Sequence, residues 1–251
     1  MFHLKHPPRT GAARRSNPGA TSTSAISERP DVIIFDVNET LLDLTHMRES
    51  VSTALNSKQE LLPLWFTTML HYSLVGTVSG RFEEFGAIGV AALQMVAHNN
   101  GISLTKEDAQ SAIIPALFHL PAHPDVKPAL QALKQQGYKL ACLTNSSTQG
   151  VKRQFEYAGL TDCFDHRLSI EPLQIYKPDR RAYAWALGQL NVKPAQALMV
   201  AAHGWDIAGA QAAGMQTAFV ARPGQSLYPL ADTPNYNVTD LVELAHVLDI
   251  D

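Results

Sequence analysis

Residues 31–40 read DVIIFDVNET, and this stretch decides the fold. Four consecutive apolar residues, 32–35, lie between two acids, as is typical of a short strand buried on both faces of a sheet. The strand is expected to end at Asp36, and polar residues follow it directly. Ligands bind outside the carboxyl ends of the strands in open α/β sheets, so Asp36 is expected at a ligand-binding edge.

Downstream of Pro121 the pattern alternates between helix and strand. The expected helices are 125–136, one ending at Ala158, 178–190, 206–213 and 238–248, and the expected strands are 138–143, 166–170, 197–202 and 217–221. Such alternation predicts an α/β fold: a Rossmann-like, doubly wound parallel sheet covered by helices on both faces.

Between the first strand and this alternating region, residues 46–120 read almost wholly as helix, with apolar residues three and four positions apart. An insertion directly after a strand's carboxyl end lies over the ligand crevice of such a sheet. We therefore predict a core domain of residues 31–45 and 121–251 and an inserted helical cap subdomain of residues 46–120.

The first thirty residues are rich in Ser, Thr, Pro, Arg and Gly and have little apolar content. They cannot bury enough surface to offset the entropy of ordering, so residues 1–30 are predicted to be a disordered extension. An Arg- and Ser-rich, acid-poor start also resembles an organelle transit peptide. A flexible extension or a misassigned start is the interpretation we favour.

The charge distribution favours a small-molecule partner. The chain of 251 residues has a net charge of −3; residues 1–30 carry five basic residues against one acid, a net of +4, which leaves −7 for the rest. A mildly acidic body without a basic stripe does not predict nucleic-acid binding. Neither an unbroken run of 18 apolar residues nor a secretory segment is found, so we expect no membrane insertion and a cytoplasmic protein.

The two cysteines, Cys142 and Cys163, have no metal-ligand spacing. Cys142 lies within an apolar run, where a packed thiol is expected. A zinc site and a disulfide scaffold are therefore not predicted.

Four segments bring polar residues to the predicted ligand edge of the sheet. They are residues 36–40 after the first strand, 144–147 after the second, Lys177 beside Pro178, and His203 with Asp206 after the fourth. The carboxyl ends of parallel strands meet at one edge, so these groups are expected to converge.

These segments resemble the four motifs of the haloacid dehalogenase superfamily: DVNETLL at 36–42, LTN at 143–145, YKPD at 176–179 and HGWD at 203–206. The resemblance covers about residues 31–250. It is closest to the type II L-2-haloacid dehalogenases, through YKP followed by Tyr183 and through Trp205-Asp206.

The resemblance implies that the Asp36 carboxylate attacks the substrate carbon to give an ester, which water then hydrolyses. It implies that Lys177 lowers the pKa of Asp36 and that Thr40 orients its second oxygen. Asp206 would hold Lys177 or activate the hydrolytic water. These four residues are the predicted catalytic set.

Phosphatases of the superfamily carry an acid two residues after the nucleophile, where this chain has Asn38, and another acid in the fourth motif, where it has Ala202. Magnesium prefers several hard oxygen ligands, and of the acids that the resemblance places at the magnesium site only Asp36 and Asp206 are present in this chain. We therefore expect metal-independent chemistry without a cofactor. Phosphoryl transfer remains an alternative that these two missing acids argue against.

The sequence also departs from the dehalogenase pattern. The family's halide-binding arginine follows a cap tryptophan, and that position is Phe66 here. A serine and an asparagine of the fourth motif are replaced by Ala201 and His203. A neutral imidazole at His203 could act as a general base, or it could simply replace the amide as a hydrogen-bonding group.

Several residues match those that line the dehalogenase pocket, although apolar residues at helical spacing are often plain core. We expect the substrate to contact Asn38, Phe66, Leu70, Phe85, Thr144, Asn145, Tyr183, His203 and Trp205.

The sequence thus predicts a hydrolase that removes halide from small (S)-2-haloacids through an aspartyl ester. The alternatives are a phosphatase, a hydrolase for another small carboxylic acid, and a binding protein that has kept the fold without catalysis. The apolar cap could also shelter a homodimer interface.

Overall fold

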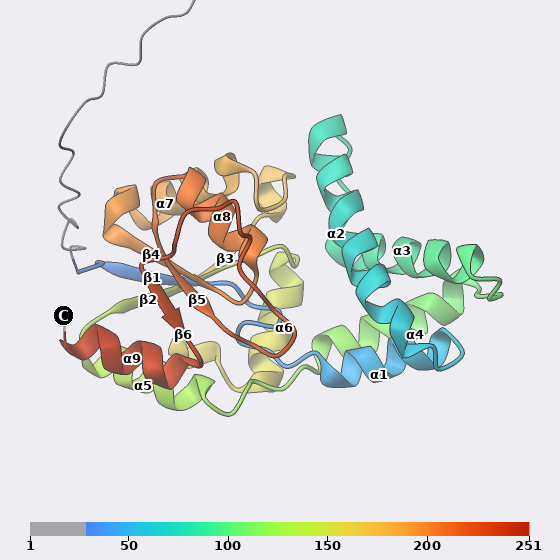
Figure 1. Cartoon of the computed structure of the whole chain (residues 1–251), viewed down its shortest axis with the longest axis horizontal. Coiled ribbons are helices and arrows are strands. Elements are labelled where there is room, and N and C mark those ends of the chain that lie inside the picture. The colour runs from blue at the N-terminus through green and yellow to red at the C-terminus, as the bar shows by residue number, and fades with distance from the viewer. Residues whose placement is uncertain (1–28, 251) are drawn as a thin grey trace, which may run out of the picture.

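The computed structural model describes residues 29–250, and its core is one parallel sheet (Figure 1). The spatial order is β3-β2-β1-β4-β5-β6, with every neighbouring pair parallel. The strands are β1 (Val32–Phe35), β2 (Lys139–Thr144), β3 (His166–Ser169), β4 (Ala197–Ala201), β5 (Gln216–Val220) and β6 (Tyr236–Val238). The predicted doubly wound α/β fold is confirmed. The predicted disordered extension lies outside the described residues, apart from Arg29 and Pro30.

Strand β1 occupies the centre of the sheet, between β2 and β4. All of its residues are buried, which explains its unbroken apolar run. The order in which strands are added reverses beside β1, because β2 and β3 extend the sheet on one side of it and the later strands β4, β5 and β6 extend it on the other. This is the position at which open α/β sheets bind ligands.

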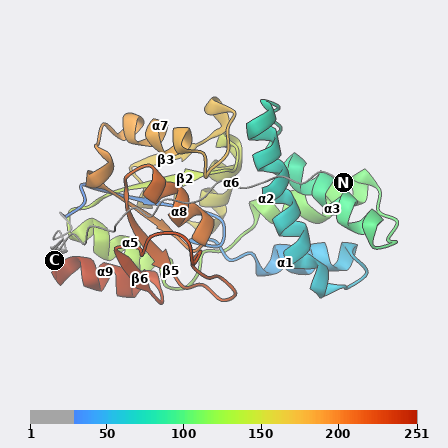
Figure 2. The ribbon, with the colours of Figure 1, turned by 45° about the horizontal axis from the view of Figure 1, so that its top comes forward.

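Helices cover both faces of the sheet (Figures 1 and 2). Helices α5 (Val126–Gln135) and α9 (Leu241–Ile250) pack together on one face, and α7 (Arg180–Leu190) and α8 (Gly204–Ala212) pack together on the other. Helix α6 (Thr148–Ala158) begins where the Ser147 hydroxyl accepts the N–H of Gly150 at 3.2 Å. This helix therefore starts with a side-chain cap directly after the ligand edge of β2.

The insertion after β1 forms a separate helical unit at one end of the molecule (Figure 2). It contains α1 (Thr45–Ala54), η1 (Gln59–Leu61), α2 (Leu62–Ser79), α3 (Phe85–Asn99) and α4 (Lys106–Phe118). The Trp65 indole is buried between α2 and α3 and donates to the Gly89 carbonyl at 2.9 Å. Because Gly89 has no Cβ, the Met69 sulfur packs closely against its backbone.

Three local features differ from the sequence prediction. Strand β6 was not predicted, because its three residues are too few to show a periodic pattern. The last helix begins at Leu241 instead of Val238. Helix α7 begins at Arg180 instead of Pro178, after an Asp179 side chain that accepts the Arg181 N–H.

One described helical segment, Gln59–Ser79, is long and apolar enough to cross a membrane, by length and composition alone. This segment contains no unbroken run of 18 apolar residues, because polar residues such as Thr67 and His71 interrupt it. One such segment is weak evidence for a membrane, and α2 packs against α3.

The close approach of α8 to the segment that carries Lys177 depends on Gly209. A Cβ at this position would lie 2.5 Å from Pro178 and 2.6 Å from the Tyr183 hydroxyl oxygen. We expect Gly209→Ala to lower the free energy of unfolding by roughly 1–3 kcal/mol, since overpacking forces neighbours to shift. Urea unfolding measures it.

The helical Gly188 is the matched control, because a Cβ there meets nothing within 4 Å. Gly188→Ala is expected to be neutral or to stabilise the protein by up to about 1 kcal/mol. Equal stability of the two variants would contradict the assigned contact.

Candidate active site

The Asp36 carboxylate lies at the carboxyl end of β1 and has a different set of donors on each oxygen. Its Oδ1 accepts a hydrogen bond from Lys177 Nζ at 3.0 Å. Its Oδ2 accepts one from the Thr40 hydroxyl at 2.7 Å and lies 3.3 Å from His203 Nδ1. The Thr40 oxygen itself accepts the N–H of Ala202 at 2.9 Å, which directs the hydroxyl proton toward Asp36.

The Lys177 ammonium is fully buried and uses all three of its donors. Its Nζ donates to Asp36 Oδ1, to Asp206 Oδ2 at 2.7 Å and to the Leu143 carbonyl at 2.8 Å. Its backbone N–H donates to Asn145 Oδ1 at 3.0 Å. Since every donor is occupied, the position of the ammonium is fixed from several sides.

This arrangement keeps both partners charged. Burial alone would raise the pKa of Asp36, but the Lys177 ammonium and the His203 imidazole outweigh it and hold that pKa below its ordinary value. Burial alone would lower the pKa of Lys177, whereas the carboxylates of Asp206 and Asp36 raise it. An ionised carboxylate is thus kept at the end of β1 with little water around it.

Both oxygens of Asp206 are occupied by protein donors. Oδ2 accepts from Lys177, and Oδ1 accepts from the Tyr183 hydroxyl at 2.5 Å. Burial, together with repulsion from Asp36, raises the pKa of Asp206 against the attraction of Lys177. Of the two predicted roles, the geometry favours holding Lys177 over activating water.

A second buried ion pair lies next to Asp36. His203 Nε2 is 2.7 Å from Glu39 Oε2, and both side chains are nearly inaccessible. Burial by itself would lower the pKa of His203, but hydrogen bonds with Asp36 and Glu39 raise it to about 9. His203 is therefore an imidazolium at neutral pH, which argues against the neutral general base considered from the sequence.

Glu39 was not assigned a role by sequence reasoning, nor were its other two partners. Its carboxylate accepts hydrogen bonds from Arg48 and, at 3.2 Å, from Gln225. The only indication in the sequence that Glu39 belongs to the site was its position in the polar run after β1. Its contacts with Arg48 and Gln225 arise only when the chain folds.

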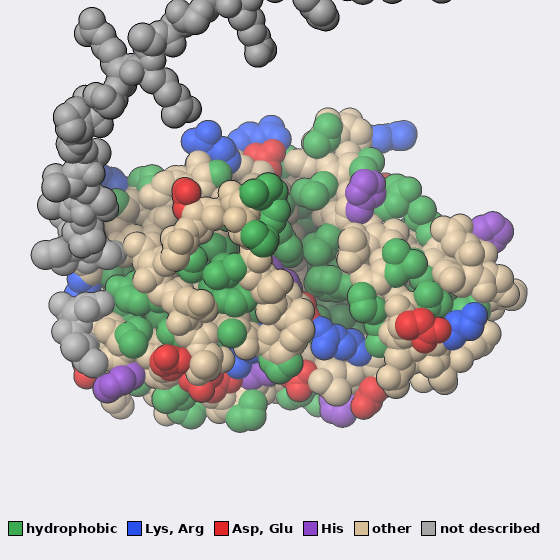
Figure 3. Space-filling view, in the orientation of Figure 1, with side chains coloured by type: hydrophobic (Ala, Val, Ile, Leu, Met, Phe, Trp, Pro, Cys, Tyr) green, Lys and Arg blue, Asp and Glu red, His purple; other side chains and the backbone are tan. Residues whose placement is uncertain are grey.

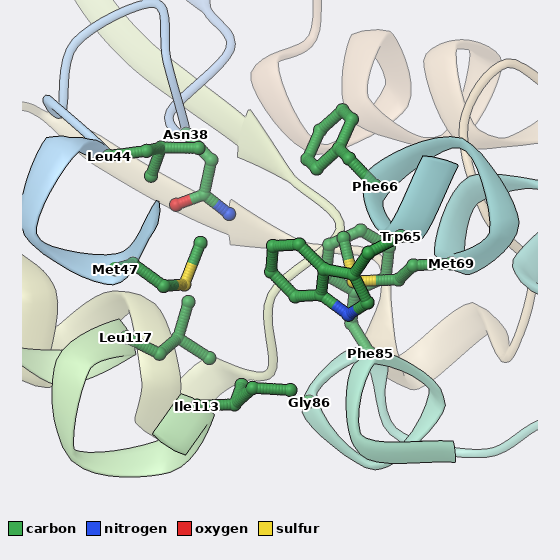
Figure 4. A pocket seen from close by; sticks show the side chains of 10 residues that line it. All are labelled: Asn38, Leu44, Met47, Trp65, Phe66, Met69, Phe85, Gly86, Ile113 and Leu117. Carbon is green, nitrogen blue, oxygen red and sulfur yellow. The ribbon is translucent and has the colours of Figure 1, made fainter. Parts of the chain in front are cut away.

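Two cavities lie between the cap and the core. One is small and almost entirely apolar: Trp65, Phe85 and other cap side chains surround it, and Asn38 is its polar residue (Figure 4). The other measures about 550 Å³, and the space-filling view is hollowed between the two units (Figure 3). Its lining includes Glu39, Arg48, Phe66, Leu70, His203 and Trp205.

The remaining predicted residues lie around these groups. Asn38 donates to the Ser146 hydroxyl at 3.2 Å and faces the small cavity (Figure 4). The Thr144 hydroxyl accepts the Ser146 N–H at 3.1 Å and thus shapes the loop after β2. Because Asn145 uses its oxygen on Lys177, the donor end of its amide can serve a ligand.

Between residues 29 and 250, no group of three or more His, Cys, Asp or Glu side chains is arranged to hold a metal ion. The two carboxylates that such an ion would share, Asp36 and Asp206, are bridged by the Lys177 ammonium.

Comparison with known proteins gives one consistent result. The model of the haloacid dehalogenase-like hydrolase family matches residues 30–214. The (S)-2-haloacid dehalogenase of Pseudomonas sp. strain YL is 32% identical over 210 residues, which are 83% of this chain and 90% of that protein. The L-2-haloacid dehalogenase structure from Xanthobacter autotrophicus is 25% identical, with a TM-score of 0.80 over 87% of this chain and 98% of that one.

The raised pKa of His203 predicts how stability depends on pH. The folded-state pKa of His203 is about 9, against an ordinary value of 6.5. The contribution of the charged imidazole to the free energy of unfolding is therefore complete below pH 6.5 and is lost as pH rises through about 9. The free-energy difference between the wild type and His203→Gln should shrink by roughly 3 kcal/mol from about pH 6 to about pH 10. Urea unfolding at both pH values checks this, and a constant difference would show that His203 does not change charge on folding.

Proposed function

This chain belongs to the haloacid dehalogenase-like hydrolases, and we propose that it is a hydrolytic dehalogenase of small (S)-2-haloacids. The observation that carries this proposal is the buried Lys177–Asp36 pair, which holds an ionised carboxylate in a dry site. A carboxylate is a weak nucleophile in water, and removal of its hydration shell strengthens its interaction with a reacting carbon.

The donors on Asp36 indicate which oxygen attacks. Oδ2 has two donor groups, Thr40 and His203, while Oδ1 has only Lys177 and keeps a lone pair for the substrate. Oδ1 bonds to the α-carbon as the carbon–halogen bond breaks and the halide leaves with the bonding electrons. Water then adds to the ester carbon, and the products are the 2-hydroxy acid, a proton and regenerated Asp36.

Phe66 occupies the position at which the type II dehalogenases have their halide-binding arginine. The leaving-group site of this chain must therefore be built differently. The Trp205 side chain lines the larger cavity, and its indole nitrogen is buried without a hydrogen-bond partner among the described residues. An unpaired buried donor is costly, and a bound anion would satisfy it. We therefore propose that the Trp205 N–H and the edge of Phe66, which lines the same cavity, receive the halide.

We also propose that the reaction needs no metal. The Lys177 ammonium supplies a positive charge between Asp36 and Asp206, and Asn38 stands where phosphatases of the superfamily place a second acid. These features support displacement at carbon over phosphoryl transfer.

The cap supports a proposal that two copies pair. Helix α2 exposes several large apolar side chains, Val78 most of all, on a helix that is little buried within one chain. Large exposed apolar patches mark interaction sites. A homodimer in the cytoplasm, without nucleic acid or membrane, is the arrangement we propose.

Replacement of the nucleophile tests the chemistry. Asp36→Asn should lower halide release from (S)-2-chloropropionate on the order of 10³-fold or more, because the amide cannot form the ester. Asp31→Asn, at the exposed position directly before the same strand, is the matched control and should keep wild-type activity. Ion chromatography measures halide, with and without EDTA. Full activity of Asp36→Asn, or loss of wild-type activity in EDTA, would contradict the proposal.

Charge on the exposed face of α2 tests the pairing. The double variant Val75→Lys, Val78→Lys should show the mass of one chain by light scattering, because two buried lysines oppose association. Val242→Lys, at a half-exposed position on α9, should keep the mass of two chains. A wild-type protein with the mass of one chain would overturn the dimer.

A further inference from the structure

The imidazole of His203 lies between two carboxylates, Asp36 on its Nδ1 side and Glu39 on its Nε2 side. A neutral imidazole has one N–H, so one of these contacts would then set a nitrogen lone pair against carboxylate lone pairs. Only the imidazolium donates to both. With both carboxylates ionised, this geometry therefore calls for a proton on each nitrogen.

Glu39 holds its carboxylate in place at a conformational cost. Its φ of 65° lies in the left-handed region, which a residue with a Cβ seldom adopts. Backbone strain of this kind clusters at functional sites, where the surrounding contacts maintain it. Here those contacts are the donors from Arg48, Gln225 and His203 to the Glu39 carboxylate.

Aromatic side chains fix the plane of the imidazole. The rings of Phe66 and Trp205 stack on His203 with interplanar angles of 21° and 22°. Phe66 belongs to the cap and Trp205 to the core, so the ring is held by both units. A cation on aromatic faces gains further stabilisation.

We infer that Glu39 and His203 act as a pair in the hydrolysis of the Asp36 ester, in which the imidazolium Nδ1–H stabilises the charge that develops on Oδ2. This inference rests on the proposed function, since it requires the ester. Once Oδ1 is alkylated, Oδ2 is the carbonyl oxygen. It already faces the Thr40 hydroxyl and His203, which together form an oxyanion hole.

The reaction balances with this pair unchanged. Water adds to the ester carbon and loses one proton to solvent, and the electron pair of the carbonyl moves onto Oδ2. Collapse re-forms the carbonyl and breaks the bond between that carbon and Oδ1. The departing Oδ1 takes the second proton of the water and becomes the hydroxyl of the product. Asp36 is then again a carboxylate, which now contains the oxygen of the water.

Charge pairing explains why Glu39 is required. Ester formation removes the negative charge of Asp36, which pairs with both Lys177 and His203 before the reaction. Lys177 then keeps Asp206 as its counterion, and His203 keeps Glu39. Without Glu39, the imidazolium would lose its last anion at the step that uses it.

Separation of the two chemical steps tests this inference. With (S)-2-chloropropionate, His203→Gln should release a burst of about one halide per site and then turn over on the order of 10²-fold more slowly than the wild type. The ester should accumulate on the Asp36 peptide in acid-quenched samples, where mass spectrometry detects it. His166→Gln, an exposed histidine at the start of β3 and away from the site, is the control and should behave as the wild type.

The isosteric variant Glu39→Gln provides a second test, which remains valid if His203→Gln does not fold. The titratable groups in contact with this pair are Asp36, Arg48 and His123, and Lys177 with Asp206 lies beyond Asp36; all of them remain in the variant. Ester hydrolysis in Glu39→Gln should lose its rate at lower pH than in the wild type, while the halide burst persists.

The outcomes separate the inference from the function beneath it. A wild type that releases no halide from any 2-haloacid overturns both. If the wild type releases halide, two results overturn the inference alone for His203→Gln: equal loss of the burst and of turnover, or full turnover. An unchanged pH profile of Glu39→Gln overturns it as well.

Discussion

The site depends on one buried ammonium. Lys177 can remain charged inside the protein only because each of its three N–H groups has an oxygen acceptor, on Asp36, on Asp206 and on the Leu143 carbonyl. Loss of either carboxylate would leave one buried N–H of the ammonium without its acceptor, which typically costs about 1–3 kcal/mol. The three acceptors come from β1, β2 and the start of α8, so the ammonium also ties together the elements that position the nucleophile.

Two cations and three carboxylates then form a chain of alternating charge: Asp206, Lys177, Asp36, His203 and Glu39. Asp36 is the middle anion, and it is the one that the reaction neutralises. Because each cation has a second counterion, loss of the central charge leaves two neutral pairs. The half-exposed Arg48 continues the chain to the larger cavity between core and cap, which it helps to line.

Much of this could be predicted from residues 31–40 and the alternation that follows Pro121. A buried parallel strand requires an unbroken apolar run, and its carboxyl end fixes where Asp36 must lie. The contacts of Glu39 could not be predicted, because they depend on a left-handed backbone conformation and on Gln225, which is distant in sequence. Likewise, His203 was expected either as a neutral base or as a hydrogen-bonding substitute, since its charge is set by two carboxylates that only the fold brings to it.

The central claim is that Asp36 forms a bond to carbon through one of its own oxygens. The most direct measurement is a single turnover of (S)-2-chloropropionate in water enriched in heavy oxygen, with enzyme in excess and mass spectrometry of the peptide that contains Asp36. Attack of water on the ester carbon predicts that the heavy oxygen appears in this peptide after the first turnover. Heavy oxygen found in the hydroxy acid alone would mean that water attacks the substrate directly, and it would contradict the role assigned to Asp36.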